Sequence, residues 1–139
     1  MFLLCIAKPG IDLEETLKAS ETSRHVLRFY RPKDMGWGIR IEVATVSSAL
    51  SLLSELRWYQ MRYMSCSLIE EPEHGVYLTP TLAQKVYEDR EVTLNDSWEH
   101  VYRCAVLESG EILKVPMGVD TPSDTQVSFM VWGIAEETP

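Results

Sequence analysis

The sequence has few of the residues, and none of the motifs, on which familiar catalytic sites are built. It has three cysteines in 139 residues and no CxxC pair, which argues against a disulfide framework and a zinc ribbon. The patterns GxSxG, GxGxxG and GxxxxGKS/T are also missing, so there is no serine-hydrolase, dinucleotide or P-loop signature. The three histidines have no spacing typical of metal ligands. From motifs alone we predict neither a metal site nor a cofactor.

Long hydrophobic runs are missing as well. The apolar run 2–7 is short and Lys8 follows it, which is the reverse of the order in a signal peptide. No run approaches the ~20 apolar residues needed to cross a bilayer. Cys5, Cys66 and Cys104 stand among apolar neighbours, so we expect buried, reduced thiols that act as small hydrophobic side chains. The sequence therefore predicts a cytoplasmic protein with no membrane partner.

Positive charge is scarce. Thirteen Lys and Arg stand against 21 Asp and Glu, which gives a net charge of -8. Such a surface repels phosphate backbones, so direct binding to nucleic acid is disfavoured. It is typical of a soluble protein and also suits a basic protein partner. The stretch 24–40 is the exception: its five basic residues face a single acid, and it is either a solvated face or an anion site.

What the sequence does contain is the composition and alternation of a globular domain. It is 45% hydrophobic and 24% charged, and its length suits one domain spanning 1–139. Strand and helix patterns follow one another without a linker or a repeat, which predicts an α+β domain. We expect a mixed or mainly antiparallel sheet with two or three helices. The expected strands are 2–7, 25–31, 39–44, 63–69, 75–78, 101–108, 111–115 and 127–134.

Capping residues mark where the helices begin. A side-chain oxygen just before an apolar-periodic segment satisfies free backbone N–H groups, and proline fits the first helical position. The longest helical pattern covers 46–60, and another runs to about residue 89. The start signals are Asp12 with Glu15, Thr45, Thr79 with Pro80, and, for one further turn, Asp96 with Glu99.

A cluster of aromatic, methionine and arginine residues at the end of the longest helix predicts an interface. These residue types are enriched at the hot spots of protein–protein contacts. The segment WYQMRYM covers nearly every direction of a helix, so not all its side chains can face one core. The alternative is that the helix ends near residue 58 and a buried strand follows. The predicted interface residues are Trp58, Tyr59, Met61, Arg62 and Tyr63.

Several segments resemble the nicotinamide-binding half of ADP-ribosyltransferases. GVYLTPTLAQKVY, from residue 75, reads as a strand, a turn and a helix that carries Ala83 and Tyr87. VYRCAVLESGEILKVP, from residue 101, resembles the strand pair that follows in that family. QVSFMVWGIAE, from residue 126, resembles its late strand, and HVLRFYR, from residue 25, stands where the family has its early strand.

The resemblance implies a NAD site with three tasks. An aromatic ring stacks on the nicotinamide, a hydroxyl group holds the pocket, and a forked guanidinium binds the pyrophosphate. In this chain the tasks would fall to Tyr77 or Tyr87, to Thr79 or Thr81, and to Arg28 or Arg31, respectively.

The sequence departs from that family at the start of the late strand. The resemblance implies that Gln126 and Tyr77 would lie at the reacting centre, with Gln126 where the family has a glutamate. An amide can hydrogen-bond a ribose hydroxyl, but it carries no negative charge to stabilise an oxocarbenium-like transition state. A NAD-binding domain of this kind is therefore expected to be catalytically degenerate.

The sequence thus favours a small acidic protein-binding domain, such as an inhibitor, an immunity-type protein or a regulatory factor. It would act through the aromatic, methionine and arginine surface together with its acidic loops. The alternative is an ADP-ribosyltransferase-like domain that binds NAD. The first hypothesis requires no enzyme activity, whereas the second allows NAD-dependent ADP-ribosyl transfer.

Overall fold

The chain folds as an α+β domain around one mixed sheet, as predicted. The computed structural model describes residues 1–88 and 100–137. The eight strands lie in the order β2-β3-β1-β4-β5-β8-β6-β7, and every neighbouring pair is antiparallel except β5 with β8. They are β1 Phe2–Ala7, β2 Lys33–Asp34, β3 Gly38–Glu42, β4 Met64–Glu71, β5 Val76–Leu78, β6 Val101–Leu107, β7 Ile112–Pro116 and β8 Thr125–Trp132.

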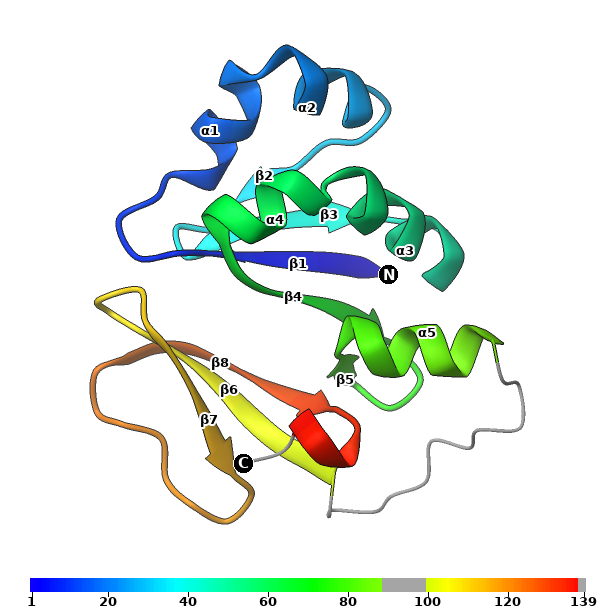
Figure 1. The fold of residues 1–139 in the computed structure, drawn as a ribbon. Helices are drawn as coiled ribbons and strands as arrows, with labels where there is room; N and C mark the ends of the chain where they lie inside the picture. The colour runs from blue at the N-terminus through cyan, green and yellow to red at the C-terminus, as the bar shows by residue number, and fades with distance from the viewer. Residues whose placement is uncertain (89–99, 138–139) are drawn as a thin grey trace.

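Five α-helices accompany the sheet within the described residues, more than the two or three expected. Figure 1 shows α1 to α4 gathered over the half of the sheet made by β2, β3, β1 and β4, with α5 beside β5. None of the helices in the described part of the chain is long and apolar enough to cross a membrane. They are α1 Leu13–Ala19, α2 Glu21–Val26, α3 Val46–Glu55, α4 Arg57–Tyr63 and α5 Pro80–Glu88, followed by the short 3-10 turn Ala135–Glu137.

Three of the predicted helix starts are confirmed by hydrogen bonds. Asp12 accepts from the backbone N–H of Glu15, and Thr45 accepts from that of Ser48. Thr79 accepts from the N–H of Leu82 and precedes Pro80, the first residue of α5. Each cap satisfies a backbone donor that the helix itself leaves free. The turn expected at Asp96 and Glu99 lies outside the described residues.

The strand expected at 25–31 is wrong. Residues Glu21–Val26 form α2, and Leu27 and Tyr30 continue from it through backbone turns. In a strand Leu27 and Phe29 would share one face, but Leu27 is 8% exposed and Phe29 is 83% exposed. The local reason is Ser23, whose buried hydroxyl donates to the Leu17 carbonyl and ties α2 to α1.

The long helix expected at 46–60 is broken at Leu56. The backbone of this residue leaves helical geometry, with φ -96° and ψ 10°, while its side chain is fully buried. The chain turns there, α4 begins, and the Gln60 amide donates back to the Leu53 carbonyl across the break. The turn therefore sets α4 in its own direction over β4.

The sheet has a hydrophobic core on each face. Alternate residues of β1 separate them: Leu3 and Cys5 join the helices in the first core, and Leu4 and Ile6 join the second. The second core packs strands against strands, because Leu68 of β4 meets residues of β6 and β8. Those residues are Tyr102, Cys104, Val106 and Val131.

The sheet bends to make this second core possible. β5 and β8 separate β4 from β6, so in a flat sheet β4 and β6 would lie ~14 Å apart. β5 is only three residues long, and just Tyr77 and Leu78 pair with β8. The two halves of the sheet therefore fold toward each other at β5, as Figure 1 shows.

Candidate functional site

The α4 surface consists of Trp58, Met61, Arg62 and Tyr63. Trp58 is 53% exposed and Met61 is 70% exposed, so two large apolar side chains lie at the surface of one short helix. The Arg62 guanidinium lies 4.3 Å from the centre of the Trp58 ring, and Tyr63 contacts the same ring edge-on. The ring and the cation form one cation–π unit that faces solvent.

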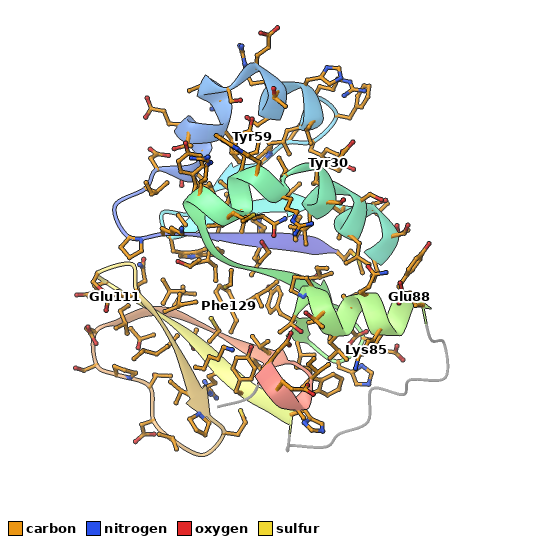
Figure 2. The ribbon with its side chains drawn as sticks, in the orientation of Figure 1. Tyr30, Tyr59, Lys85, Glu88, Glu111 and Phe129 are labelled. Atoms are coloured by element: carbon orange, nitrogen blue, oxygen red, sulfur yellow. The ribbon has the colours of Figure 1, made fainter. Side chains whose placement is uncertain are left out.

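Tyr59, the fifth predicted interface residue, points the other way. It is 6% exposed and lies between α4 and the α1–α2 pair, as Figure 2 shows. Its hydroxyl lies 2.5 Å from that of Ser20, and this hydrogen bond lowers the pKa of the phenol. Tyr59 therefore anchors α4 to the first core, while its neighbour Trp58 is left on the outside.

One of the two alternatives left open by the sequence, a buried strand directly after residue 58, is wrong. The helix continues to Tyr63, and the strand β4 begins directly after it at Met64. Because α4 is helical, Trp58, Met61 and Arg62 share its outer face. The aromatic and methionine residues of this segment are thus divided between the surface and the core.

The charge of α4 differs from that of the molecule as a whole. The helix RWYQMRY carries Arg57 and Arg62, both exposed, and no acidic residue. Lys8 lies beside it, because its ammonium group donates to the Met61 carbonyl at 3.0 Å. These three cations make a local positive surface on a chain whose net charge is -8.

An acidic cleft adjoins this surface at Lys8. It has a volume of about 440 Å³ and is bounded by three loops, which are 8–13, 34–38 and 108–110. Asp12, Asp34 and Glu108 line it against the single cation Lys8. Asp12 is held as the α1 cap, and Asp34 accepts from the Gly36 N–H at 2.9 Å, so two of its carboxylates are fixed in place.

An aromatic residue forms part of the cleft wall. Trp37 lines the cleft and contacts Phe129 edge-on, with ring centres 5.2 Å apart. Phe129 in turn contacts Tyr77 at 5.3 Å and lies between the two halves of the sheet (Figure 2). A tryptophan face beside carboxylates is suited to an organic cation such as a Lys or Arg side chain.

The two residues implied as the reacting centre of a transferase lie apart. Gln126 lines the acidic cleft, and its amide donates to the Leu107 carbonyl at 2.9 Å. Tyr77 pairs with Val131, which follows Gln126 by five residues on β8. Five residues of strand span ~16 Å, so Tyr77 and Gln126 lie far apart along β8. Burial raises the pKa of Tyr77, which fits its place against Phe129 in the second core.

The residues implied as NAD ligands are also dispersed. Arg28 follows α2, donates to the His25 carbonyl and stacks on Phe29. Arg31 is exposed in the same connection, Thr79 is buried as the α5 cap, and Tyr87 is 53% exposed on α5. Within the described residues, no hydrogen bond or ring contact joins any of them to Gln126 or to Tyr77.

The acidic turn at the end of β4 brings together three side chains that have the chemistry of metal ligands, which the sequence did not predict. Ligand atoms of Glu71, Glu73 and His74 all lie within 4.8 Å of one another and could hold a metal ion. The Glu71 carboxylate accepts from the His74 ring at 2.7 Å and from its backbone N–H. These contacts also fit an ordinary hydrogen-bonded surface turn.

Two features were beyond the reach of sequence reasoning. The cleft joins residues from three loops, and only the Asp-Met-Gly-Trp-Gly turn at 34–38 gives a local hint of it. Cys66 packs against the second core, which contains Cys104, although 37 residues separate the two in the chain. Neither proximity follows from any spacing pattern.

The chain matches the model of a known protein family. Residues 3–105, about three quarters of the chain, match the model of the Family of unknown function (DUF5804). No curated protein and no solved structure matches the chain. The matched region contains the whole α4 surface and two of the three cleft loops, whereas Gln126 lies outside it. The chain therefore belongs to the family of unknown function DUF5804.

Proposed function

We propose that this protein binds another protein through the α4 surface, with the acidic cleft as a second contact. The observation that carries the proposal is the exposure of Trp58 and Met61 beside a stacked Arg62. Tryptophan, methionine and arginine are enriched at the centres of interfaces, where a few residues supply most of the binding energy. Inhibitors, immunity-type proteins and regulatory factors all act through surfaces of this kind.

The rigidity of the α4 surface supports the same conclusion. The rings of Tyr59 and Tyr63 contact Trp58 edge-on, at 5.0 and 6.1 Å. Tyr59 is fixed in the core and Tyr63 is half-buried, so the exposed ring is supported from beneath. A preorganised side chain loses little conformational freedom on binding, which favours affinity.

Charge defines the chemistry of the partner. The cations of Arg57, Arg62 and Lys8 favour an acidic segment with an apolar side chain to cover Trp58. The cleft on the other side of Lys8 favours a basic side chain from the same partner, because its carboxylates face a single cation. We therefore infer a partner surface on which an acidic, apolar segment lies next to a Lys or Arg.

A comparative pull-down tests the α4 surface. The wild-type chain and Trp58→Ala are used as baits, and bound proteins are quantified by mass spectrometry. The matched control is Phe29→Ala, which removes another exposed aromatic ring that also stacks with an arginine. We expect Trp58→Ala to weaken a true partner about 30-fold or more, as at other tryptophan hot spots, and Phe29→Ala to leave it bound.

Charge reversal then tests the chemistry of that partner. Arg62→Glu should weaken binding of the purified partner, and the wild-type affinity should fall as salt rises. An unchanged partner list with Trp58→Ala would exclude the α4 surface. Tight, salt-independent binding by Arg62→Glu would exclude an acidic partner.

NAD binding remains the alternative that the sequence raises. No observation favours it over protein binding: HVLRFYR lies in α2 and the turns after it, and Gln126 lies ~16 Å along β8 from the partner of Tyr77. A ligand that binds the native state raises its melting temperature. Our proposal predicts no shift at millimolar NAD, and a shift of several degrees would favour the transferase-like alternative.

A further inference from the structure

A small apolar pocket lies between the first two helices and the sheet, apart from the α4 surface and the acidic cleft. It has a volume of about 170 Å³. Leu17 of α1, Leu27 after α2 and Ile39 of β3 line it, and each is at most 8% exposed. Because these three side chains belong to the first core, the pocket reaches down to that core. The other lining residues are Pro32, Glu14, Lys18 and Arg24.

The walls of the pocket are held by hydrogen bonds. The buried Ser23 hydroxyl donates to the Leu17 carbonyl at 2.5 Å, which joins α2 to α1. The Leu27 N–H donates to the Ser23 carbonyl at 2.9 Å, and the Leu27 carbonyl accepts from the Tyr30 N–H. A pocket whose lining is fixed in this way is preformed, so a ligand need not order it on binding.

One of the three charged lining residues is left without a partner. Glu14 and Lys18 form an ion pair one helical turn apart, so their charges offset each other. The Arg24 side chain has no hydrogen bond or ion pair with any residue that the structure describes. Residues 22–33 also carry four cations and no acid. The pocket therefore combines an apolar lining with one free guanidinium.

We propose that this pocket binds a small carboxylic acid with a branched or aromatic apolar end. The apolar end lies against Leu17, Leu27 and Ile39, and the carboxylate accepts hydrogen bonds from Arg24. A guanidinium presents two parallel N–H donors that match the two oxygens of a carboxylate. The basic stretch that the sequence left as either a solvated face or an anion site is thus an anion site at Arg24.

The volume sets the size of the ligand. A protein cavity of about 150 Å³ lined by Leu, Ile and Phe binds benzene. A pocket of about 170 Å³ therefore holds one ring or one branched chain of about six carbons. A long acyl chain is too large for it.

The surroundings favour a free acid over a side chain of a protein partner. A stable protein interface covers about 800 Å² on each partner, and its centre is depleted of charged residues. Here the charged side chains of Glu14, Lys18 and Arg24 stand at the pocket itself. Binding of a small acid needs only the pocket and its one free cation.

Three probes separate the two parts of the site. The nitrogen-15-labelled full-length chain is titrated at pH 7 with 4-methylpentanoate, with its neutral amide and with acetate, and backbone amide shifts are followed by nuclear magnetic resonance. We expect 4-methylpentanoate to shift the amides of Leu17, Leu27 and Ile39 with a dissociation constant of about 1 mM. The neutral amide should bind about 10-fold more weakly because it lacks the charge. Acetate lacks the apolar end and should not saturate the site.

A pair of arginine variants tests the role of the cation. Arg24→Gln should weaken 4-methylpentanoate about 10-fold and leave the amide unchanged. The matched control is Arg28→Gln, which removes the same charge one turn further along. The Arg28 guanidinium already contacts the His25 carbonyl and the Phe29 ring, and it does not line the pocket. This variant should bind the acid as the wild type does.

Four results would overturn the proposal. They are no shifts with tens of millimolar 4-methylpentanoate, equal binding of the acid and its amide, shifts that map outside the pocket, and equal loss of binding in Arg24→Gln and Arg28→Gln. The first three come from the wild-type chain alone. The test therefore holds even if a variant fails to fold.

Discussion

At the residue scale, neighbours in the chain serve opposite purposes. Trp58 and Tyr59 are adjacent aromatic residues, yet one is 53% exposed and the other 6%. The helical period separates them by about 100°, so only one can face the core. Tyr59 also gains a hydroxyl partner in Ser20, which a tryptophan at that position would lose. Tyr59 therefore packs in the core, and Trp58 lies at the surface.

The buried thiol of Cys5 predicts that the stability of the protein depends on pH. Burial raises the pKa of this thiol from about 9 in the unfolded chain to about 12 in the fold. Between these values the unfolded state loses a proton that the folded state keeps, so the free energy of unfolding falls as pH rises. The loss from this one thiol is about 1 kcal/mol per pH unit.

Urea unfolding at several pH values between 8 and 11 checks this prediction. The wild-type midpoint should hold near pH 8 and fall above pH 9. Cys5→Ala is less stable throughout because it leaves a small cavity, but its midpoint should fall less steeply. Equal slopes for the two proteins would mean that Cys5 does not titrate in this range.

At the element scale, the side chain of Thr79 decides where α5 begins. It is 7% exposed, and its hydroxyl accepts from the Leu82 N–H at 3.3 Å. Thr79→Ala removes the acceptor and leaves a buried donor unsatisfied, so we expect a loss of about 1 kcal/mol of stability. Thr79→Ser keeps the hydroxyl and should recover most of this loss, as measured by urea unfolding. Equal losses for the two variants would assign the effect to packing of the methyl group.

The elements that the sequence predicts correctly are those fixed by local chemistry. Thr45 and Thr79 cap helices because their hydroxyls lie within three residues of the donors they satisfy. The strands expected at 101–108 and 111–115 form the β6–β7 hairpin, and Gly110 between them, with φ +91°, supplies the left-handed turn. Each signal and the structure it specifies lie close together in the chain.

The element that the sequence predicts wrongly depends on a contact with the neighbouring helix α1. The alternation of apolar residues at 25–31 is typical of a strand, but Ser23 bonds back to Leu17 and keeps the chain helical. The same distinction applies to the site. The α4 surface is local and could be predicted, whereas the cleft needs three loops to meet. The resemblance implies that Gln126 lies beside Tyr77, whereas in the structure it lines the cleft and donates to the Leu107 carbonyl.

At the scale of the whole molecule, the short strand β5 determines the shape. Gly75, with φ +69°, precedes it and Thr79 begins a helix after it, so only three residues remain to pair. β4 and β8 are both eight residues long, and each pairs with β5 over only two or three residues. No sequence pattern encodes how far a sheet bends. For that reason the second core was not predicted.

The two cores then raise the question of whether they unfold together. The first packs helices on the sheet and the second packs strands on strands, yet the residues of β1 alternate between them. Loss of either core should remove support from β1 and therefore from the other core.

We predict that Leu52→Ala in the first core and Leu68→Ala in the second each lower the free energy of unfolding by about 2–5 kcal/mol. Tryptophan fluorescence and far-ultraviolet circular dichroism should report one shared urea transition in both variants, because a single cooperative unit has no stable half. If Leu68→Ala instead separates the two signals into distinct transitions, the halves of the sheet fold independently and the bend at β5 is a boundary between domains.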